Sequence, residues 1–324
     1  PRVGTARGLS RPMVHLVTLP QSSLQVSSVC FGANVFGWSI TDQTEANRLL
    51  DEVVDRGVNF FDSADMYVQW QPGNSGGESE TMLGSWLKTS GVDRDSLVIA
   101  TKVGKMTTRP GLHPDTIKKA ADESLQRLGI DTIDLYYAHL DDESVPLEDT
   151  LGAFGELIQA GKVRQIGASN YRAERLEQAL QLAQSHNLPR YVAVQNHYNL
   201  VAREPFESDM ADLVEREQLW GLPYFSLASG FLTGKYRRGE ANQSVRNERV
   251  ENDYLTEENF NTLDRLLTLA GHINAAASTI ALEWLRQQPG VSVPIASASR
   301  IDQLDDLLAE VSLSPDDLSY LAGD

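Results

Sequence analysis

The sequence predicts a single α/β domain, a (β/α)8 TIM barrel with a long insertion after the seventh strand. Eight short runs rich in β-branched and aromatic residues alternate with segments of helical periodicity, as expected for parallel strands joined by crossover helices. The 324 residues suit one barrel of about 250 residues with insertions as well as two ordinary domains. An open doubly wound sheet is the competing architecture, but the glycine motif that usually follows its first strand has the wrong spacing at 31–37.

The expected strands and helices follow one another as eight strand–helix units. The strands are expected at 28–32, 59–64, 97–102, 134–139, 163–169, 191–198, 220–227 and 291–297. The helices are expected at 43–56, 78–88, 114–128, 147–160, 172–184, 205–217, 277–288 and 300–310.

Capping residues explain why several of these helices begin and end where they do. Polar side chains at 41–45 can accept hydrogen bonds from the free amides of the first turn, and Pro114 suits a first turn because its missing N–H costs little there. Gly57, Gly129 and Gly161 follow helical runs and suit the left-handed conformation at a helix C-terminus.

Two long polar segments interrupt the alternation. Residues 228–275 are too many for a simple connection, so we expect a loop or a small helical insertion after the seventh strand, on the face where barrels carry active sites. The loop 68–77 follows the second strand on the same face. At the N-terminus, residues 1–12 show no hydrophobic period and are interpreted as an extension, which leaves 13–324 as the barrel domain.

Composition excludes several classes of function. The chain is 41% hydrophobic and 23% charged, as in ordinary globular proteins. With 28 Lys and Arg against 45 Asp and Glu, the net charge of −17 argues against nucleic-acid and membrane partners. Cys30 is the only cysteine, so we expect no internal disulfide, no zinc site and a reducing cytoplasmic location. Neither a spanning segment nor a leader pattern is visible.

Four polar side chains form a chemical set at the ends of the expected strands. Asp62 follows Asn59-Phe60-Phe61 in strand two, Lys102 and His139 end strands three and four, and Tyr67 lies five residues after Asp62. Each alone would usually be structural, but in a barrel all four face one mouth. One cation at ~4 Å supplies ~4 kcal/mol in a dielectric of ~20, nearly enough to lower a tyrosine pKa from ~10 to ~7. Lys102, kept charged by Asp62, would thus prepare Tyr67 to protonate a carbonyl oxygen that His139 directs.

Short motifs around these residues resemble the aldo-keto reductase superfamily. They are Asp62-Ser63-Ala64-Asp65-Met66-Tyr67, Thr101-Lys102, Ala138-His139, Gly167-Ala168-Ser169-Asn170 and Gln195, and the match runs collinearly from about Leu19 to Asp306. The resemblance implies an (α/β)8 barrel and reversible reduction of a carbonyl group by NADPH. It assigns the catalytic tetrad to Asp62, Tyr67, Lys102 and His139.

The resemblance also implies a cofactor site. Ser169, Asn170 and Gln195 would hold the nicotinamide carboxamide, Phe225 would lie under the ring, and Ser299, Arg300 and Gln303 would receive the 2′-phosphate of NADPH. The remaining expected cofactor residues are Gly32, Asn34 and Asp62, with Ser226, Leu227, Gly230, Leu232 and Lys235 in the pyrophosphate loop. Two positions depart from the family pattern, because Ser297 stands where glycine is common and Leu307 where asparagine is common.

The expected partner is a small-molecule carbonyl substrate. It would contact Tyr67 and His139, with Trp38, Trp70 and Tyr198 as an apolar wall. Because some members of the superfamily act as channel-associated subunits, a cofactor-binding regulatory subunit with little turnover is the alternative. A barrel glycosidase is less well supported, because it needs two carboxylic acids at strand ends. Natural substrate, reaction direction and oligomeric state stay open.

Overall fold

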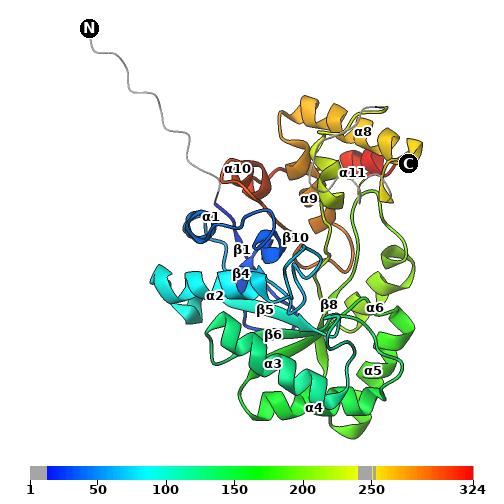
Figure 1. Cartoon of the computed structure of the whole chain (residues 1–324). Helices are drawn as coiled ribbons and strands as arrows, with labels where there is room; N and C mark the ends of the chain where they lie inside the picture. The colour runs from blue at the N-terminus through cyan, green and yellow to red at the C-terminus, as the bar shows by residue number, and fades with distance from the viewer. Residues whose placement is uncertain (1–12, 240–249, 251–252, 324) are drawn as a thin grey trace.

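The computed structural model describes residues 13–239, 250 and 253–323, and a parallel eight-stranded sheet forms its centre (Figure 1). The strand order is β10-β3-β4-β5-β6-β7-β8-β9, so the strands follow one another around the sheet almost in chain order. They are β3 (Cys30–Gly32), β4 (Phe60–Asp62), β5 (Val98–Val103), β6 (Ile133–Ala138), β7 (Val163–Ser169), β8 (Tyr191–Gln195), β9 (Trp220–Gly221) and β10 (Ile295–Ala296).

Backbone hydrogen bonds join the two edges of this sheet and close it into a barrel. The Ser292 N–H donates to the Gly221 carbonyl at 2.8 Å, and the Ile295 N–H donates to the Pro223 carbonyl at 2.9 Å. The Ser226 hydroxyl adds a third link, because its Oγ donates to the Ile295 carbonyl at 2.7 Å. The predicted (β/α)8 barrel is therefore confirmed.

Helices cover the outside of the barrel (Figure 1). They are α1 (Gln43–Asp55), α2 (Glu78–Ser90), α3 (Pro114–Leu128), α4 (Leu147–Gln159), α5 (Ala173–His186), α6 (Ala211–Arg216), α8 (Glu257–Ile273), α9 (Ala277–Arg286), α10 (Gln303–Leu308) and α11 (Pro315–Ala322). Their ends follow the sequence signals: the Asp42 side chain accepts from the Glu45 N–H at the start of α1, and Gly129 ends α3 with a φ of 65°. No helix of the described ranges has the length and apolar character needed to cross a membrane.

The structure differs from the prediction where the sequence signals were weak. An unpredicted antiparallel hairpin, β1 (Leu16–Thr18) and β2 (Gln25–Ser27), precedes the barrel, and its strands are too short to show a period of two. The seventh and eighth barrel strands are much shorter than expected. Pro223 and Pro294 lack the N–H that a strand ladder needs, which limits the pairing of both.

The long segment after β9 contains more regular structure than a loop. It begins with the 3-10 helix η4 (Ala228–Thr233) and ends with the 17-residue helix α8, while 240–249 and 251–252 lie outside the described residues. Helix α11, which was not predicted, packs against α8 at the upper right of Figure 1. The expected extension 1–12 also lies outside the described residues.

The barrel closure is tested by Gly221→Ala. A Cβ at Gly221 would lie 1.7 Å from the Gly290 carbonyl oxygen, so the two backbones must separate. We expect a loss of about 1–3 kcal/mol in the free energy of unfolding, measured by denaturant unfolding followed by circular dichroism. Gly152→Ala is the matched control, because its Cβ meets nothing within 4 Å in the interior of α4 and should add up to about 1 kcal/mol. Equal stability of the two variants would contradict the close approach.

Candidate active site

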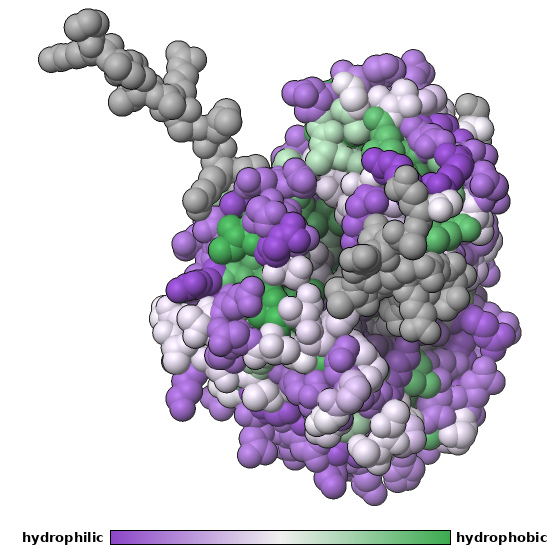
Figure 2. Space-filling model, turned by 45° about the horizontal axis from the view of Figure 1, so that its top comes forward, coloured by the Kyte–Doolittle hydropathy of each residue, from purple (hydrophilic) through white to green (hydrophobic). Residues whose placement is uncertain are grey.

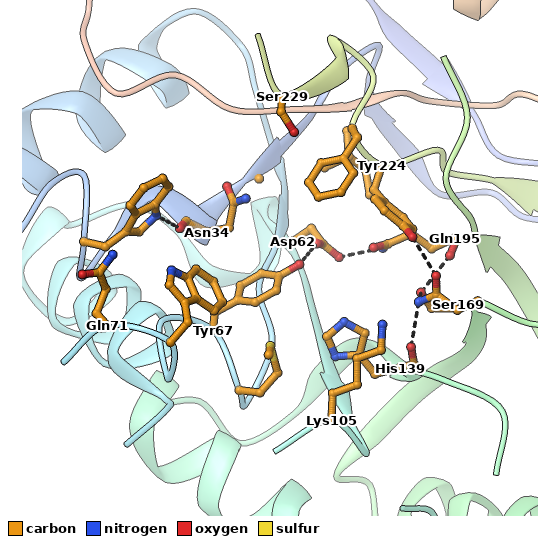
Figure 3. Close-up of a pocket in the computed structure, with 17 residues that line it drawn as sticks. Asn34, Asp62, Tyr67, Gln71, Lys105, His139, Ser169, Gln195, Tyr224 and Ser229 are labelled. Atoms are coloured by element: carbon orange, nitrogen blue, oxygen red, sulfur yellow. Dashed lines mark hydrogen bonds between the residues drawn. The ribbon is translucent and has the colours of Figure 1, made fainter. Parts of the chain in front are cut away.

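A cavity of about 580 Å³ opens at the carboxyl ends of the barrel strands (Figure 3). Many of the predicted site residues line it, namely Gly32, Asn34, Trp38, Asp62, Tyr67, Trp70, His139, Ser169, Asn170, Gln195 and Phe225. Six further lining residues were not predicted from the sequence, namely Met66, Gln71, Lys105, Tyr224, Ser229 and Ile295. The structure thus gathers residues from strands β3, β4, β7, β8 and β10, and His139 directly after β6, into one concave site.

Lys102 is hydrogen-bonded to both the Asp62 carboxylate and the Tyr67 phenol. Its side chain is fully buried, and its Nζ donates to Asp62 Oδ2 at 2.5 Å, to the Tyr67 hydroxyl at 2.8 Å and to the Ser63 carbonyl at 2.7 Å. Lys102 extends from β5, Asp62 ends the neighbouring strand β4, and Tyr67 lies in the loop that follows β4. The three groups therefore form one hydrogen-bonded cluster with the phenol facing the cavity (Figure 3).

The pKa of Tyr67 is raised to about 12, against the sequence-based expectation of about 7. Burial of the phenol is the largest cause, the Lys102 ammonium lowers the pKa, and the Asp62 carboxylate raises it. The expectation was wrong because it counted the attraction of the lysine but not the burial of the phenol, which is the larger effect, nor the opposing charge of Asp62, whose oxygen lies 2.5 Å from the lysine ammonium. Tyr67 is therefore protonated at neutral pH, which suits a proton donor.

His139 completes the predicted tetrad and faces Tyr67. The two rings meet edge to face, with centroids 6.1 Å apart. Burial, with the positive charges of Lys102 and Lys105, lowers the His139 pKa well below its usual value of 6.5. The imidazole is therefore neutral at physiological pH and can donate one hydrogen bond without adding charge to the cavity.

The predicted carboxamide anchors share one hydrogen-bond network. Gln195 Nε2 donates to Asp62 Oδ1 at 2.9 Å, and Ser169 Oγ donates to the Gln195 carbonyl at 2.7 Å. Asn170 donates from its Nδ2 to the His139 carbonyl at 2.9 Å and accepts from the Tyr224 hydroxyl at 2.7 Å. The network fixes three neutral polar side chains at one wall of the cavity and links them to the tetrad.

Tyr224 and Phe225 both line the cavity although they are neighbours in the chain. In a regular strand only one of two adjacent side chains faces a given side. Phe225 has a φ of 54°, which breaks the alternation and turns both rings toward the site. Two adjacent aromatic residues were the only hint in the sequence. The alternation expected of a strand places only one of the two in the site, so Tyr224 was not predicted.

The predicted pyrophosphate loop presents backbone and one hydroxyl rather than a row of side chains. The side chains of Ser226 and Leu232 are buried in the framework, so only the main chain of these residues can meet a ligand. Ala228, Ser229 and Gly230 have φ values of 50°, 55° and 98°, and such left-handed turns can form anion-binding concavities. Ser229 Oγ is buried at the cavity and has no hydrogen-bond partner in the described part of the chain.

The predicted 2′-phosphate residues cluster at the start of α10. Gln303 Oε1 accepts from the Ser299 N–H at 2.8 Å and from the Arg300 N–H at 3.2 Å. The exposed Arg300 guanidinium pairs with the Asp302 carboxylate at 2.9 Å. None of these residues lines the 580 Å³ cavity, but Ser297 Oγ donates to Asn34 Oδ1 at 2.8 Å and so ties this segment to its edge.

Further predicted cofactor residues and the expected substrate wall are placed as follows. Leu227 and Gly230 lie at the start of η4, and the Lys235 ammonium lies 5.4 Å from the centroid of the Tyr236 ring. Trp38 and Trp70 line the cavity with their ring centroids 6.3 Å apart. Tyr198, in contrast, is fully buried, so its assignment to the wall was wrong. Its hydroxyl donates to Glu207, and its ring stacks on Phe206 in the core.

A second carboxylate cluster lies behind the Tyr67 loop. Asp65 is fully buried, and no side chain within the described ranges forms a hydrogen bond with either carboxylate oxygen. Burial and the neighbouring Glu80 carboxylate raise the Asp65 pKa to about 7. Glu80 itself is held by Thr101 Oγ1 at 2.5 Å and by Arg127 Nε at 2.6 Å. Among the residues that the structure describes, no group of three or more His, Cys, Asp or Glu could hold a metal ion.

A family profile and several relatives show which family this chain belongs to. The aldo/keto reductase family profile matches residues 28–323. The chain is 32% identical to the Escherichia coli protein tas, over 90% of this chain and 95% of the relative. It is 34% identical to a putative voltage-gated potassium channel subunit beta of Schizosaccharomyces pombe, over 88% and 85% of the two chains. It is also 30% identical to the Bacillus subtilis uncharacterized oxidoreductase YrpG, over 92% and 91%.

Proposed function

Because the chain belongs to the aldo/keto reductase family, an oxidoreductase family, we propose that it reduces the carbonyl group of a small aldehyde or ketone with NADPH. One observation carries the proposal. A protonated phenol, a buried lysine, its carboxylate partner and a neutral imidazole meet at one cavity, with Lys102 Nζ 2.8 Å from the Tyr67 hydroxyl. This arrangement can protonate an oxygen atom on which negative charge develops.

The residues present fit a nicotinamide cofactor. The hydroxyl of Ser169 and the amides of Asn170 and Gln195 offer neutral donors and acceptors for a carboxamide, and the partnerless Ser229 hydroxyl faces the same cavity. Tyr224 or Phe225 can provide a ring platform, and Tyr224 is favoured because its hydroxyl is bonded to Asn170. When bound, the reduced nicotinamide supplies the hydride that the carbonyl carbon accepts. Arg300 would receive the 2′-phosphate by exchanging its pair with Asp302, which supports NADPH.

The chain's own residues would act on the carbonyl oxygen. His139, as a neutral imidazole, would donate a hydrogen bond that orients the oxygen toward Tyr67, and Tyr67 would donate the proton. Lys102 would stabilise the phenolate that remains, through the 2.8 Å contact of its ammonium. Asp62 keeps Lys102 charged in a fully buried position, because its carboxylate raises the lysine pKa against the effect of burial.

The direct test is a turnover assay with NADPH. Oxidation of NADPH, followed by its absorbance, is measured with a panel of aldehydes, ketones, sugars and quinones, and at least one carbonyl compound should be reduced. NADH in place of NADPH tests the role of Arg300, since the 2′-phosphate is the group that a guanidinium would recognise. Cofactor binding without turnover on any compound would contradict the reductase.

The pH dependence of reduction follows from the two pKa shifts. The Tyr67 pKa of about 12 keeps the phenol protonated, and the lowered His139 pKa keeps the imidazole neutral from below pH 6.5 upward. We therefore expect kcat/KM for carbonyl reduction to be nearly constant between about pH 6.5 and 9. A fall in rate centred near pH 7 would show instead that the phenol titrates there.

A regulatory subunit is the second candidate function. It is favoured by the 34% identity to a relative named as a putative channel subunit beta. On the face drawn in Figure 2, hydrophobic residues form separate small groups among hydrophilic ones, which is not the surface of a large apolar interface. A subunit of this kind would bind NADPH and turn over slowly, so the turnover assay separates the two.

For location we propose the cytoplasm, because Cys30 is a buried free thiol.

A further inference from the structure

Lys105 is a positive charge in the cavity that the proposed reaction does not use. The residue follows β5, beyond Gly104, and its side chain reaches the cavity beside His139 (Figure 3). Its backbone is held in place, because the Lys105 carbonyl accepts from Gln69 Nε2 at 3.2 Å. Its ammonium, in contrast, has no acidic side chain or other hydrogen-bond partner within the described ranges.

The cavity wall therefore carries a net positive charge. Asp62 and Lys102 form an ion pair, so their charges offset one another, and His139 is neutral. Each of the other lining residues is uncharged, which leaves Lys105 as the uncompensated charge of this wall in the described part of the chain. The whole protein has a net charge of −17, so a local positive charge in its main cavity is not a consequence of overall composition.

The cofactor phosphates do not account for this lysine. Figure 3 places Lys105 at the opposite end of the cavity from Ser229, which lies in the loop assigned to the pyrophosphate. Burial and the charge of Lys102 lower the Lys105 pKa, so an ionised Lys105 gains from a neighbouring anion. Its neighbour His139 is the group that would orient the substrate carbonyl.

We propose that Lys105 is a specificity-determining residue that binds an anionic group on the substrate, so that the preferred carbonyl compound carries a carboxylate or a phosphate. This inference rests on the proposed function and names its substrate class. The anionic group would lie near Lys105, the carbonyl oxygen between Tyr67 and His139, and the apolar part of the molecule against Trp70 and Met66.

Matched substrates test the inference. Carboxybenzaldehydes with the acid at the 2, 3 or 4 position are compared with their methyl esters, which keep the ring and the carbonyl and lose the charge. For the best-fitting isomer, kcat/KM of the acid should exceed that of the ester by about 10- to 100-fold, the range expected for one charged hydrogen bond. Glyceraldehyde 3-phosphate against glyceraldehyde provides the phosphate comparison.

Variants at Lys105 locate the effect. In Lys105→Met the ratio of acid to ester should fall to about one, and in Lys105→Glu it should fall below one. Lys118→Met is the control, because it removes the same charge from α3, where Lys118 pairs with Glu156 on the surface. A ratio that is unchanged in Lys105→Met overturns the inference, and a ratio that falls equally in Lys118→Met attributes it to overall charge and also overturns it.

A binding measurement separates this inference from the proposed reduction. Benzoate and benzamide are titrated into the protein, and the fluorescence of Trp38 and Trp70 in the cavity wall reports binding. Benzoate should bind more tightly to the parent protein, and the preference should be lost in Lys105→Met. If this holds while no aldehyde is reduced, the anion site stands and the proposed function fails. If aldehydes are reduced and benzoate has no advantage, the proposed function stands and the anion site fails.

Discussion

Replacing Tyr67 with phenylalanine is expected to lower kcat/KM for carbonyl reduction by about 10²- to 10⁴-fold, the usual contribution of a positioned general acid. The substitution removes one oxygen atom. Among the described residues, the other phenol that lines the cavity is that of Tyr224, whose hydroxyl donates to Asn170. Turnover is measured with the best substrate of the panel, and NADPH affinity by quenching of protein fluorescence.

Folding and cofactor binding should survive this change. In Tyr67→Phe the Lys102 ammonium keeps its contacts with Asp62 and with the Ser63 carbonyl, so no buried charge loses its counter-ion. NADPH affinity should stay within a few-fold of the parent. Tyr136→Phe is the matched control, because it removes a buried hydroxyl that has no hydrogen-bond partner among the described residues. Carbonyl reduction that persists in Tyr67→Phe at the rate of the Tyr136→Phe control would exclude Tyr67 as the proton donor.

Lys102→Met is expected to damage both stability and turnover. It leaves the buried Asp62 carboxylate with the Gln195 amide in place of a full counter-charge. Removal of one member of a buried ion pair costs about 3–5 kcal/mol in the free energy of unfolding. Without the ammonium the Tyr67 phenolate also loses its stabilisation, so the rate of reduction should fall as in Tyr67→Phe. Denaturant unfolding and the NADPH assay measure the two effects.

A double variant separates these two effects. Asp62→Asn combined with Lys102→Met removes both charges, so it should recover much of the lost stability while carbonyl reduction stays absent. If Lys102→Met alone unfolds at the denaturant concentration of the parent, the ion pair of Lys102 with Asp62 does not contribute to stability. Recovery of turnover in the double variant would contradict the role of Lys102 in the chemistry.

The barrel could be predicted because its evidence is local and repeated. Runs such as 97–102 and 134–139 are rich in aliphatic and aromatic residues, and they fall within one residue of β5 and β6. Elements without repetition were missed. The three-residue strands of the hairpin β1–β2 are too short for a pattern. Strand β9 ends early because Pro223 cannot donate to the ladder.

The chemical groups of the site could be predicted from the sequence, but the pKa values of those groups could not. Strand ends indicate that Asp62, Lys102 and His139 share one mouth, which the structure shows. The direction of the Tyr67 pKa shift depends on burial and on the distance from Lys102 to its counter-ion, and no spacing in the sequence contains either quantity. Lys105 was missed for a similar reason, because it lies past the strand end and only the folded loop turns it into the cavity.

Asp65 gives the fold an unusual response to acid. Its pKa is near 3.8 when the chain is unfolded and about 7 in the fold, so folding takes up a proton at this side chain over the interval between those values. A carboxylate whose pKa is lowered in the fold, as in most ion pairs, contributes less to stability as the solution is acidified. Asp65 has the opposite pH dependence. Its contribution to the free energy of unfolding is largest below about pH 4 and is lost progressively as the pH rises toward 7. Mild acidity thus stabilises the native packing of Asp65 behind the Tyr67 loop.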